Sequence, residues 1–112
     1  ANKEIYYWVI TELNQDSMIG SICLWNFSKD RYTGELGYDL HPDHHGLGIM
    51  SESIKGILRY AKDELHLSRM VAYTQRNNIA SCKLLEKNGF SIVKDMRDPE
   101  NDLNIIYAQE LA

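Results

Sequence analysis

Two glycines, Gly46 and Gly48, lie where an alternating apolar segment changes to helical periodicity. Glycine lets the backbone approach a ligand closely, and the first turn of a helix directs unpaired N–H groups and the positive end of its dipole at that ligand. This order of strand, glycine turn and helix predicts a site for an anionic group. An ordinary connection between strand and helix is the alternative, because short G-x-G matches are common.

Three other ligand sites are not expected in this turn or beside it. A P-loop would need G-K-(S/T), and Ser51 stands where a Rossmann fingerprint has its third glycine. His41, Asp43, His44 and His45 suggest a metal site, since imidazole and carboxylate bind zinc. Four potential ligands in one short loop rarely converge on a single ion, and no distant Cys or His pair completes the set. We therefore expect no functional metal.

The strands that must position the turn follow from apolar patterning. Two runs rich in β-branched and aromatic residues, 5–13 and 18–27, predict a hairpin around a polar turn. Both runs carry apolar residues on both faces over part of their length, which predicts a sheet covered on each side. Residues 35–40 end a third strand, in which the even-numbered residues share one face.

Apolar residues at spacings of three and four predict an amphipathic helix over residues 48–65. The next strand is predicted at residues 69–75. A strand, helix and strand of these lengths form a crossover that is nearly always right-handed and joins parallel strands. The sheet must therefore be mixed.

The C-terminal part is predicted to hold a short helix and two closing strands. Asn78 is placed to cap a helix that runs to Asn88, and Gly89 occupies the left-handed position after it. Residues 90–96 and 103–111 are predicted strands on either side of a polar turn. The expected order is β-β-β-α-β-α-β-β. We expect an α+β fold with a mixed, mostly antiparallel sheet and helices on both faces, as a single domain over the whole chain.

Composition and charge exclude several classes of partner. The 112 residues carry a net charge of −4 with a pI near 5.5, which gives no electrostatic reason to bind nucleic acid or an anionic membrane. Cys23 and Cys82 lie far apart and form no C-x-x-C pair, which fits a reducing cytosol. There is no apolar run of about 18 residues, and the polar start does not resemble a signal peptide. We expect a soluble, cytoplasmic protein.

The order of elements and three motifs resemble the Gcn5-related N-acetyltransferase (GNAT) superfamily. Its acetyl-CoA motif, Q/R-x-x-G-x-G/A, is similar to residues 45–50. N-I-A-S at residues 78–81, followed by L-L-E-K-N-G-F at 84–90, is similar to the N-x-x-S and LEK-x-GF signature of the RimJ/RimL-type ribosomal-protein N-acetyltransferase branch. Gly37 and Tyr38 are similar to the start of that branch's G-Y-W. The matches together cover about half of the chain.

Several positions depart from the family pattern. His45 replaces the usual Gln or Arg, Met50 replaces a small residue, and Asp39 stands where the branch often has Trp. Binding through backbone N–H groups tolerates such changes, because side-chain identity hardly alters those groups. The family also has a strand and two helices before residues 5–13, which form part of the acceptor wall. We therefore expect a fragment, a degenerate protein, or a homodimer in which a second subunit supplies that wall.

The resemblance implies that acetyl-CoA binds beside the glycine turn. Backbone N–H groups of the turn would hold its pyrophosphate, Asn78 would hydrogen-bond the pantetheine arm, and an N–H group of residues 38–40 would stabilise the oxyanion. The residues implied in this binding are Tyr38, Leu40, His45, Gly46, Leu47, Gly48, Ile49, Met50, Asn78 and Ser81. Without the family motifs, Asn78 and Ser81 would be interpreted as a helix cap and a first-turn residue.

The resemblance also implies direct attack of an amine on the acetyl thioester. A carboxylate or a water chain must take the proton of the amine. Glu35 is the first candidate for this base and Asp39 the second. Further candidates from the turn are His41, Asp43 and His44. A solvated strand residue is an equal interpretation of Glu35. Many family members protonate the departing thiolate with a Tyr of the second helix. Leu85 occupies that position here, which leaves Ser81 as the candidate acid.

We therefore expect an N-acetyltransferase that moves an acetyl group from acetyl-CoA to a primary amine, at a protein N-terminus or on a small molecule. The alternative is a noncatalytic GNAT module that binds CoA or a partner chain without turnover. The absent acceptor wall favours the module, whereas the pair of Asn78 and Ser81 favours the enzyme.

Overall fold

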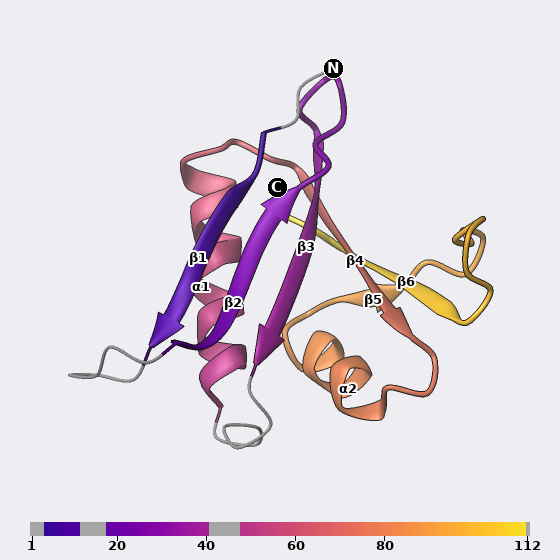
Figure 1. The fold of residues 1–112 in the computed structure, drawn as a ribbon. Helices are drawn as coiled ribbons and strands as arrows, with labels where there is room; N and C mark the ends of the chain where they lie inside the picture. The colour runs from indigo at the N-terminus through magenta and orange to yellow at the C-terminus, as the bar shows by residue number, and fades with distance from the viewer. Residues whose placement is uncertain (1–3, 12–17, 41–47, 112) are drawn as a thin grey trace.

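The computed structural model describes residues 4–11, 18–40 and 48–111 (Figure 1). Their elements are β1 Tyr6–Thr11, β2 Met18–Trp25, β3 Thr33–Leu40, α1 Ile49–Asp63, β4 Arg69–Gln75, α2 Ile79–Lys87, β5 Ser91–Ile92 and β6 Asn104–Glu110. This is the order that the sequence predicts. The strands form one sheet in the order β1-β2-β3-β4-β6-β5. Neither described helix has the length and apolar character needed to cross a membrane.

The second strand, predicted over residues 18–27, stops at Trp25. Asn26 has a left-handed backbone conformation (φ 51°), which interrupts the extended chain. The side chain of Asn26 contacts β3, where its Nδ2 donates a hydrogen bond to Glu35 Oε1 at 3.0 Å. The early end of β2 therefore supplies a contact at a predicted site residue.

The prediction of a strand over residues 90–96 is wrong in extent, because β5 covers only Ser91–Ile92. The Val93 N–H still donates to the Ile106 carbonyl at 2.8 Å. The chain then turns, and the Met96 N–H donates back to the Val93 carbonyl at 3.4 Å. The local turn thus ends the pairing with β6.

The sheet is mixed, as predicted, and β3 and β4 are its parallel pair among the described strands. This pair runs only from Thr33↔Arg69 to Leu36↔Ala72. Beyond it, β3 stays paired with β2, and β4 stays paired with β6. In Figure 1, β4 and β6 turn away from β1, β2 and β3. The sheet therefore divides at the C-terminal ends of β3 and β4.

One face of the sheet packs against both helices. Leu36, Ala72 and Tyr107 are aligned across β3, β4 and β6, so their side chains lie on the same face. They share a single buried core with Ile54 of α1 and Leu85 of α2. Both helices therefore cover the face that carries these three residues.

The expected placement of helices on both faces is not met within the described residues. The connections from β3 to β4 and from β4 to β5 cross the sheet in the same direction. Crossovers of the same hand that run in the same direction place their helices on the same side of a sheet. The helices also contact each other, because Asn88 Nδ2 donates to Ser51 Oγ at 3.1 Å.

The other face of the sheet carries exposed apolar side chains. Tyr7, Val9, Trp25 and Tyr73 lie on it, with 60%, 52%, 41% and 37% of their surfaces exposed. Neither of the described helices covers them. Trp25 and Tyr73 are of particular interest, because they flank the point where β3 and β4 diverge.

Both ends of α2 have the local bonds that the sequence predicts. At the N-terminal end, Asn78 Oδ1 accepts a hydrogen bond from the Ser81 N–H at 3.1 Å. At the other end, Gly89 is left-handed (φ 93°) and the Phe90 N–H donates to the Leu85 carbonyl at 3.0 Å. The first turn of α2, which carries Ser81, is therefore fixed at the end of β4.

The cap at Asn78 can be tested by its contribution to stability. Asn78→Ala leaves the Ser81 N–H without its acceptor, so we expect the free energy of unfolding in urea to fall by about 1 kcal/mol. Asn78→Asp keeps an acceptor and should retain most of the stability. Asn77→Ala is the matched control, because Asn77 precedes the cap. Equal losses in the two alanine variants would contradict the assignment.

Candidate active site

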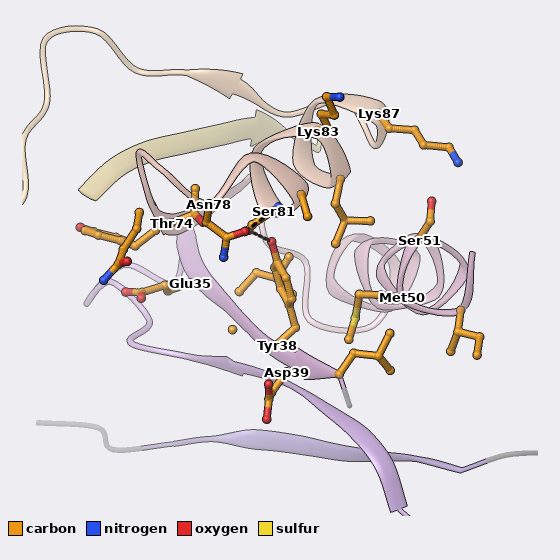
Figure 2. Close-up of a pocket in the computed structure, with 18 of the residues that line it drawn as sticks. Glu35, Tyr38, Asp39, Met50, Ser51, Thr74, Asn78, Ser81, Lys83 and Lys87 are labelled. Atoms are coloured by element: carbon orange, nitrogen blue, oxygen red, sulfur yellow. Dashed lines mark hydrogen bonds between the residues drawn. The ribbon is translucent and has the colours of Figure 1, made fainter. Parts of the chain in front are cut away.

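A cleft of about 920 Å³ lies where β3 and β4 diverge (Figure 2). Its walls are the second half of β3, the end of β4 and the first turns of α1 and α2, and its volume is typical of ligand sites. The predicted cofactor residues that line it are Tyr38, Leu40, Gly48, Ile49, Met50, Asn78 and Ser81. His45, Gly46 and Leu47 lie outside the described residues, as does the histidine cluster.

The N-terminus of α1 borders this cleft at Gly48. This residue is the N-cap, has a left-handed backbone (φ 76°) and offers no side chain to the first N–H groups of the helix. A Cβ atom at this position would meet no atom of the described residues within 4 Å. Unpaired N–H groups and the helix dipole favour an anion here. The described half of the predicted anion site thus suits a phosphate.

Two lysines add positive charge to the same part of the cleft. Lys83 and Lys87 line it from α2. Figure 2 shows them on the same side of the cleft as Ser51 in the first turn of α1. The helix N-terminus and the two ammonium groups together place positive charge at this part of the cleft.

Tyr38 and Ser81 form a pair of hydroxyl groups on the cleft wall. Tyr38 Oη and Ser81 Oγ lie 2.5 Å apart, and Figure 2 shows the Tyr38 ring pointing from β3 toward α2. Burial raises the pKa of the Tyr38 phenol, and the bond to Ser81 only partly opposes this effect. The Tyr38 phenol is therefore protonated, and either hydroxyl group can be the donor of this hydrogen bond. The sequence predicts both residues but not their contact.

The sequence leaves two interpretations of Asn78 open, a helix cap and a ligand contact, and the structure is compatible with both. Its Oδ1 atom caps α2 by accepting from the Ser81 N–H. Its Nδ2 atom carries the remaining donors, and the residue lines the cleft. The helix cap and a ligand contact therefore use different atoms of the same side chain.

Glu35 and Asp39 line the cleft from the face of β3 opposite to Tyr38. Figure 2 shows Asp39 pointing away from α2. Glu35 is half-buried, and this burial is the main reason that its pKa is raised. The hydrogen bond from Asn26 lowers the pKa and the negative charge of Asp98 raises it, with a net rise above the usual value of a glutamate. A raised pKa suits a carboxylate that takes a proton near neutral pH.

The sequence analysis missed the residues that β2 and β4 contribute to the cleft. They are Trp25, Tyr73, Thr74 and Gln75. A signal for the last three existed, because the predicted crossover places the end of the strand at residues 69–75 beside residues 37–40. No sequence signal distinguishes Trp25 from the other aromatic residues of the first two strands.

A sheet that divides beside its parallel pair, with a helix N-terminus at the division, defines the acyl-CoA N-acyltransferase class of fold. The family model of the acetyltransferase (GNAT) domain matches residues 1–91. The chain therefore belongs to the GNAT family, and the resemblance seen in its motifs is confirmed.

Relatives of known sequence include bacterial acetyltransferases. The probable N-acetyltransferase YjcK of Bacillus subtilis is 35% identical over 88 residues, which are 78% of this chain and 49% of that protein. The ribosomal-protein-serine acetyltransferase of Escherichia coli is 26% identical over 97 residues, which are 81% of this chain and 54% of that protein. The chain spans about half the length of the curated relatives it matches.

Solved structures share the fold at low sequence identity. The ribosomal-protein-S5-alanine acetyltransferase of Vibrio fischeri has a TM-score of 0.82 at 22% identity, with 95% of this chain and 61% of that chain covered. The F149A mutant of spermidine N-acetyltransferase SpeG from Vibrio cholerae has a TM-score of 0.79 at 18% identity, with 96% and 66% covered. The predicted GNAT-like fold is thus confirmed, and the ribosomal-protein acetyltransferases among these proteins agree with the RimJ/RimL-type resemblance.

The environment of Glu35 predicts how its carboxyl group titrates. In a carboxyl-resolved NMR titration, Glu35 should have a pKa above that of an ordinary glutamate, because burial disfavours its charged form. Asn26→Gly, which suits the left-handed backbone at this position, removes a donor to the carboxylate and should raise the pKa further. Asp98→Asn removes a negative charge and should lower it.

Asp63→Asn is the control for a loss of charge at the exposed end of α1, and it should leave the Glu35 titration unchanged. A Glu35 that titrates at or below the ordinary value in the wild-type protein would contradict the described environment. So would shifts of the same sign in the Asn26 and Asp98 variants.

Proposed function

We propose that this chain carries an acetyl-transfer site, at which the acetyl group of acetyl-CoA passes to a primary amine. The observation that carries the proposal is the cleft at the division of the sheet, which the N-terminus of α1 borders and which has the Tyr38–Ser81 hydroxyl pair on its wall. Membership in the GNAT family supports the same reaction. A noncatalytic module that only binds CoA is the alternative outcome of the tests below.

Acetyl-CoA would be held by backbone groups more than by side chains. The N–H groups after Gly48, with Ile49, Met50 and the turn at residues 45–47, would bind the pyrophosphate. Beyond Leu36, β3 no longer pairs with β4, so the backbone of residues 38–40 can bond the extended pantetheine arm and the oxyanion. Asn78 Nδ2 would donate to the same arm.

The residue proposed as the base and the residues proposed to protonate the sulfur lie on different faces of β3. Glu35, or Asp39 in second place, would take a proton from the ammonium form of the amine, so that the neutral nitrogen can bond to the acetyl carbon. As the carbon–sulfur bond breaks, Ser81 would pass its proton to the departing sulfur and would regain a proton from the nitrogen as that nitrogen becomes an amide. Tyr38 would position Ser81 by donating to its oxygen, and the raised pKa of the phenol keeps that donor protonated.

The acceptor would be a protein N-terminus or a small-molecule amine. The first is supported by the names of the ribosomal-protein acetyltransferases, and the second by the name of the spermidine N-acetyltransferase. Cytoplasmic location, a single domain over the whole chain and a possible homodimer stay predictions.

Binding of acetyl-CoA is tested with a matched pair of substitutions at Gly48. Asn and Asp both tolerate a left-handed backbone, and a Cβ atom at Gly48 would meet no atom of the described residues within 4 Å, so the two variants differ chiefly in charge. By calorimetry we expect Gly48→Asn to keep most of the affinity of the wild type. Gly48→Asp should lose about tenfold or more, because its carboxylate repels the pyrophosphate.

Turnover is tested by the release of CoA thiol with a panel of amines and N-terminal peptides. Ser81→Ala should lower kcat on the order of 100-fold, with Tyr38→Phe lowering it less. Tyr32→Phe, at an exposed tyrosine outside the cleft, is the control. A wild-type protein that binds acetyl-CoA but releases no thiol above background would favour the noncatalytic module.

A further inference from the structure

Residues of β2, β3 and β4 line the mouth of the cleft on the face of the sheet away from α1 and α2. They include Trp25 of β2, Glu35 and Gly37 of β3, and Tyr73 of β4. Trp25 lies directly opposite Glu35 in the antiparallel pair of β2 and β3. Tyr73 follows the last parallel pair of β3 and β4, so it lies across the division of the sheet. Two aromatic rings therefore flank a carboxylate and a glycine.

Gly37 allows Cys23 and Trp25 to lie close to the backbone of β3. A Cβ atom at this position would lie 3.0 Å from Cys23 Sγ and 3.7 Å from Trp25 Nε1. The Trp25 indole therefore leans over Gly37, toward the division of the sheet. Gly37, Trp25, Tyr73 and Glu35 all line the cleft.

The mouth is electronegative. The charge of Glu35 contributes to raising the pKa values of Tyr73 and Cys23, and Asp98 acts in the same direction on Glu35 and Tyr73. These effects need the groups to be near one another. The described hydrogen-bond partner of the Glu35 side chain is the neutral amide of Asn26, so the carboxylate is not neutralised by that contact.

Different parts of the cleft lining thus carry charges of opposite sign. One part has the N-terminus of α1 with Lys83 and Lys87, which suits an anionic ligand. The face of β3 opposite to Tyr38 contributes the carboxyl groups of Glu35 and Asp39. The rings of Trp25 and Tyr73 would also attract a cation, because the face of an aromatic ring carries partial negative charge.

We propose that the mouth is the acceptor subsite, and that it recognises the acceptor as a primary alkylammonium ion held against the rings of Trp25 and Tyr73 above the Glu35 carboxylate. Its role as an acceptor subsite rests on the proposed function. The charged amine enters this part of the cleft, transfers its proton to Glu35 and then attacks as the neutral amine. Trp25, Tyr73 and Gly37 are the residues that determine acceptor specificity. They select a cation with a slender alkyl chain.

The subsite is tested without acetyl-CoA, so that no transfer occurs. Butylammonium is titrated into the uniformly labelled protein, and the indole N–H signals of Trp25 and Trp8 are followed by NMR. We expect a saturable shift at Trp25, with little change at Trp8, which faces the core on the other side of β1. The neutral alcohol pentan-1-ol, of similar length, should bind about fivefold more weakly or worse.

Substitutions identify the groups that bind the cation. Trp25→Leu and Tyr73→Leu, followed through the Gly37 amide signal, should each weaken butylammonium binding by about three- to thirtyfold, and Glu35→Gln should weaken it as well. Tyr7→Leu is the matched control, because Tyr7 is an exposed aromatic residue of the same face but does not line the cleft. Equal binding of the alcohol, or an unchanged Kd in Trp25→Leu, would overturn the proposal.

A second measurement uses acetyl-CoA turnover and separates the two proposals. Trp25→Leu should raise the KM for butylamine while leaving the KM for acetyl-CoA unchanged, and an N-terminal peptide in place of butylamine shows which source of ammonium the mouth prefers. Turnover with no response of the acceptor KM to Trp25→Leu or Tyr73→Leu would overturn the subsite and leave the proposed function standing. Saturable butylammonium binding in a protein that does not bind acetyl-CoA would support the cation site and defeat the proposed function.

Discussion

The early end of the parallel pairing between β3 and β4 is the constraint on which the candidate site depends. Residues 37–40 stay paired with β2, and residues 73–75 stay paired with β6, so each strand keeps its outer partner while the inner edges separate. Separated strand edges expose N–H and C=O groups that an extended ligand can pair, much as an added strand would. A sheet paired to the ends of both strands would have neither the cleft nor these groups.

The two crossovers then determine what borders the division. Each helix begins after a strand of the parallel pair, so the N-termini of α1 and α2 both lie at the carboxyl ends of β3 and β4, where open sheets usually bind ligands. Because both helices lie on one face, Tyr38 reaches Ser81 across the cleft, and Ser51 bonds Asn88 behind it. The opposite face keeps its aromatic side chains exposed.

Much of the fold could be predicted because its signals are local. The order of elements follows from periodicity, and the ends of α2 follow from Asn78 and Gly89, whose roles depend on a few neighbouring residues. The contact between Tyr38 and Ser81 could not be predicted, since it joins residues 43 apart through the packing angle of α2. The raised pKa of Glu35 could not be predicted either, because it arises from burial and from groups in irregular segments. Both helices lie on one face because the two crossovers have the same hand and run in the same direction. Apolar residues on both faces of a strand do not reveal this placement.

The alternation of side chains along β3 separates the proposed base from the proposed acid. Successive side chains of a strand point to opposite faces, so Glu35 lies on one side of the sheet and the Tyr38–Ser81 pair on the other. A base and an acid in direct contact would exchange a proton and neutralise each other's function. Here the strand separates them, while the division between β3 and β4 gives a ligand access to both. Residues 38–40 continue along β3 beyond its pairing with β4, so one of their backbone N–H groups can donate to a developing oxyanion.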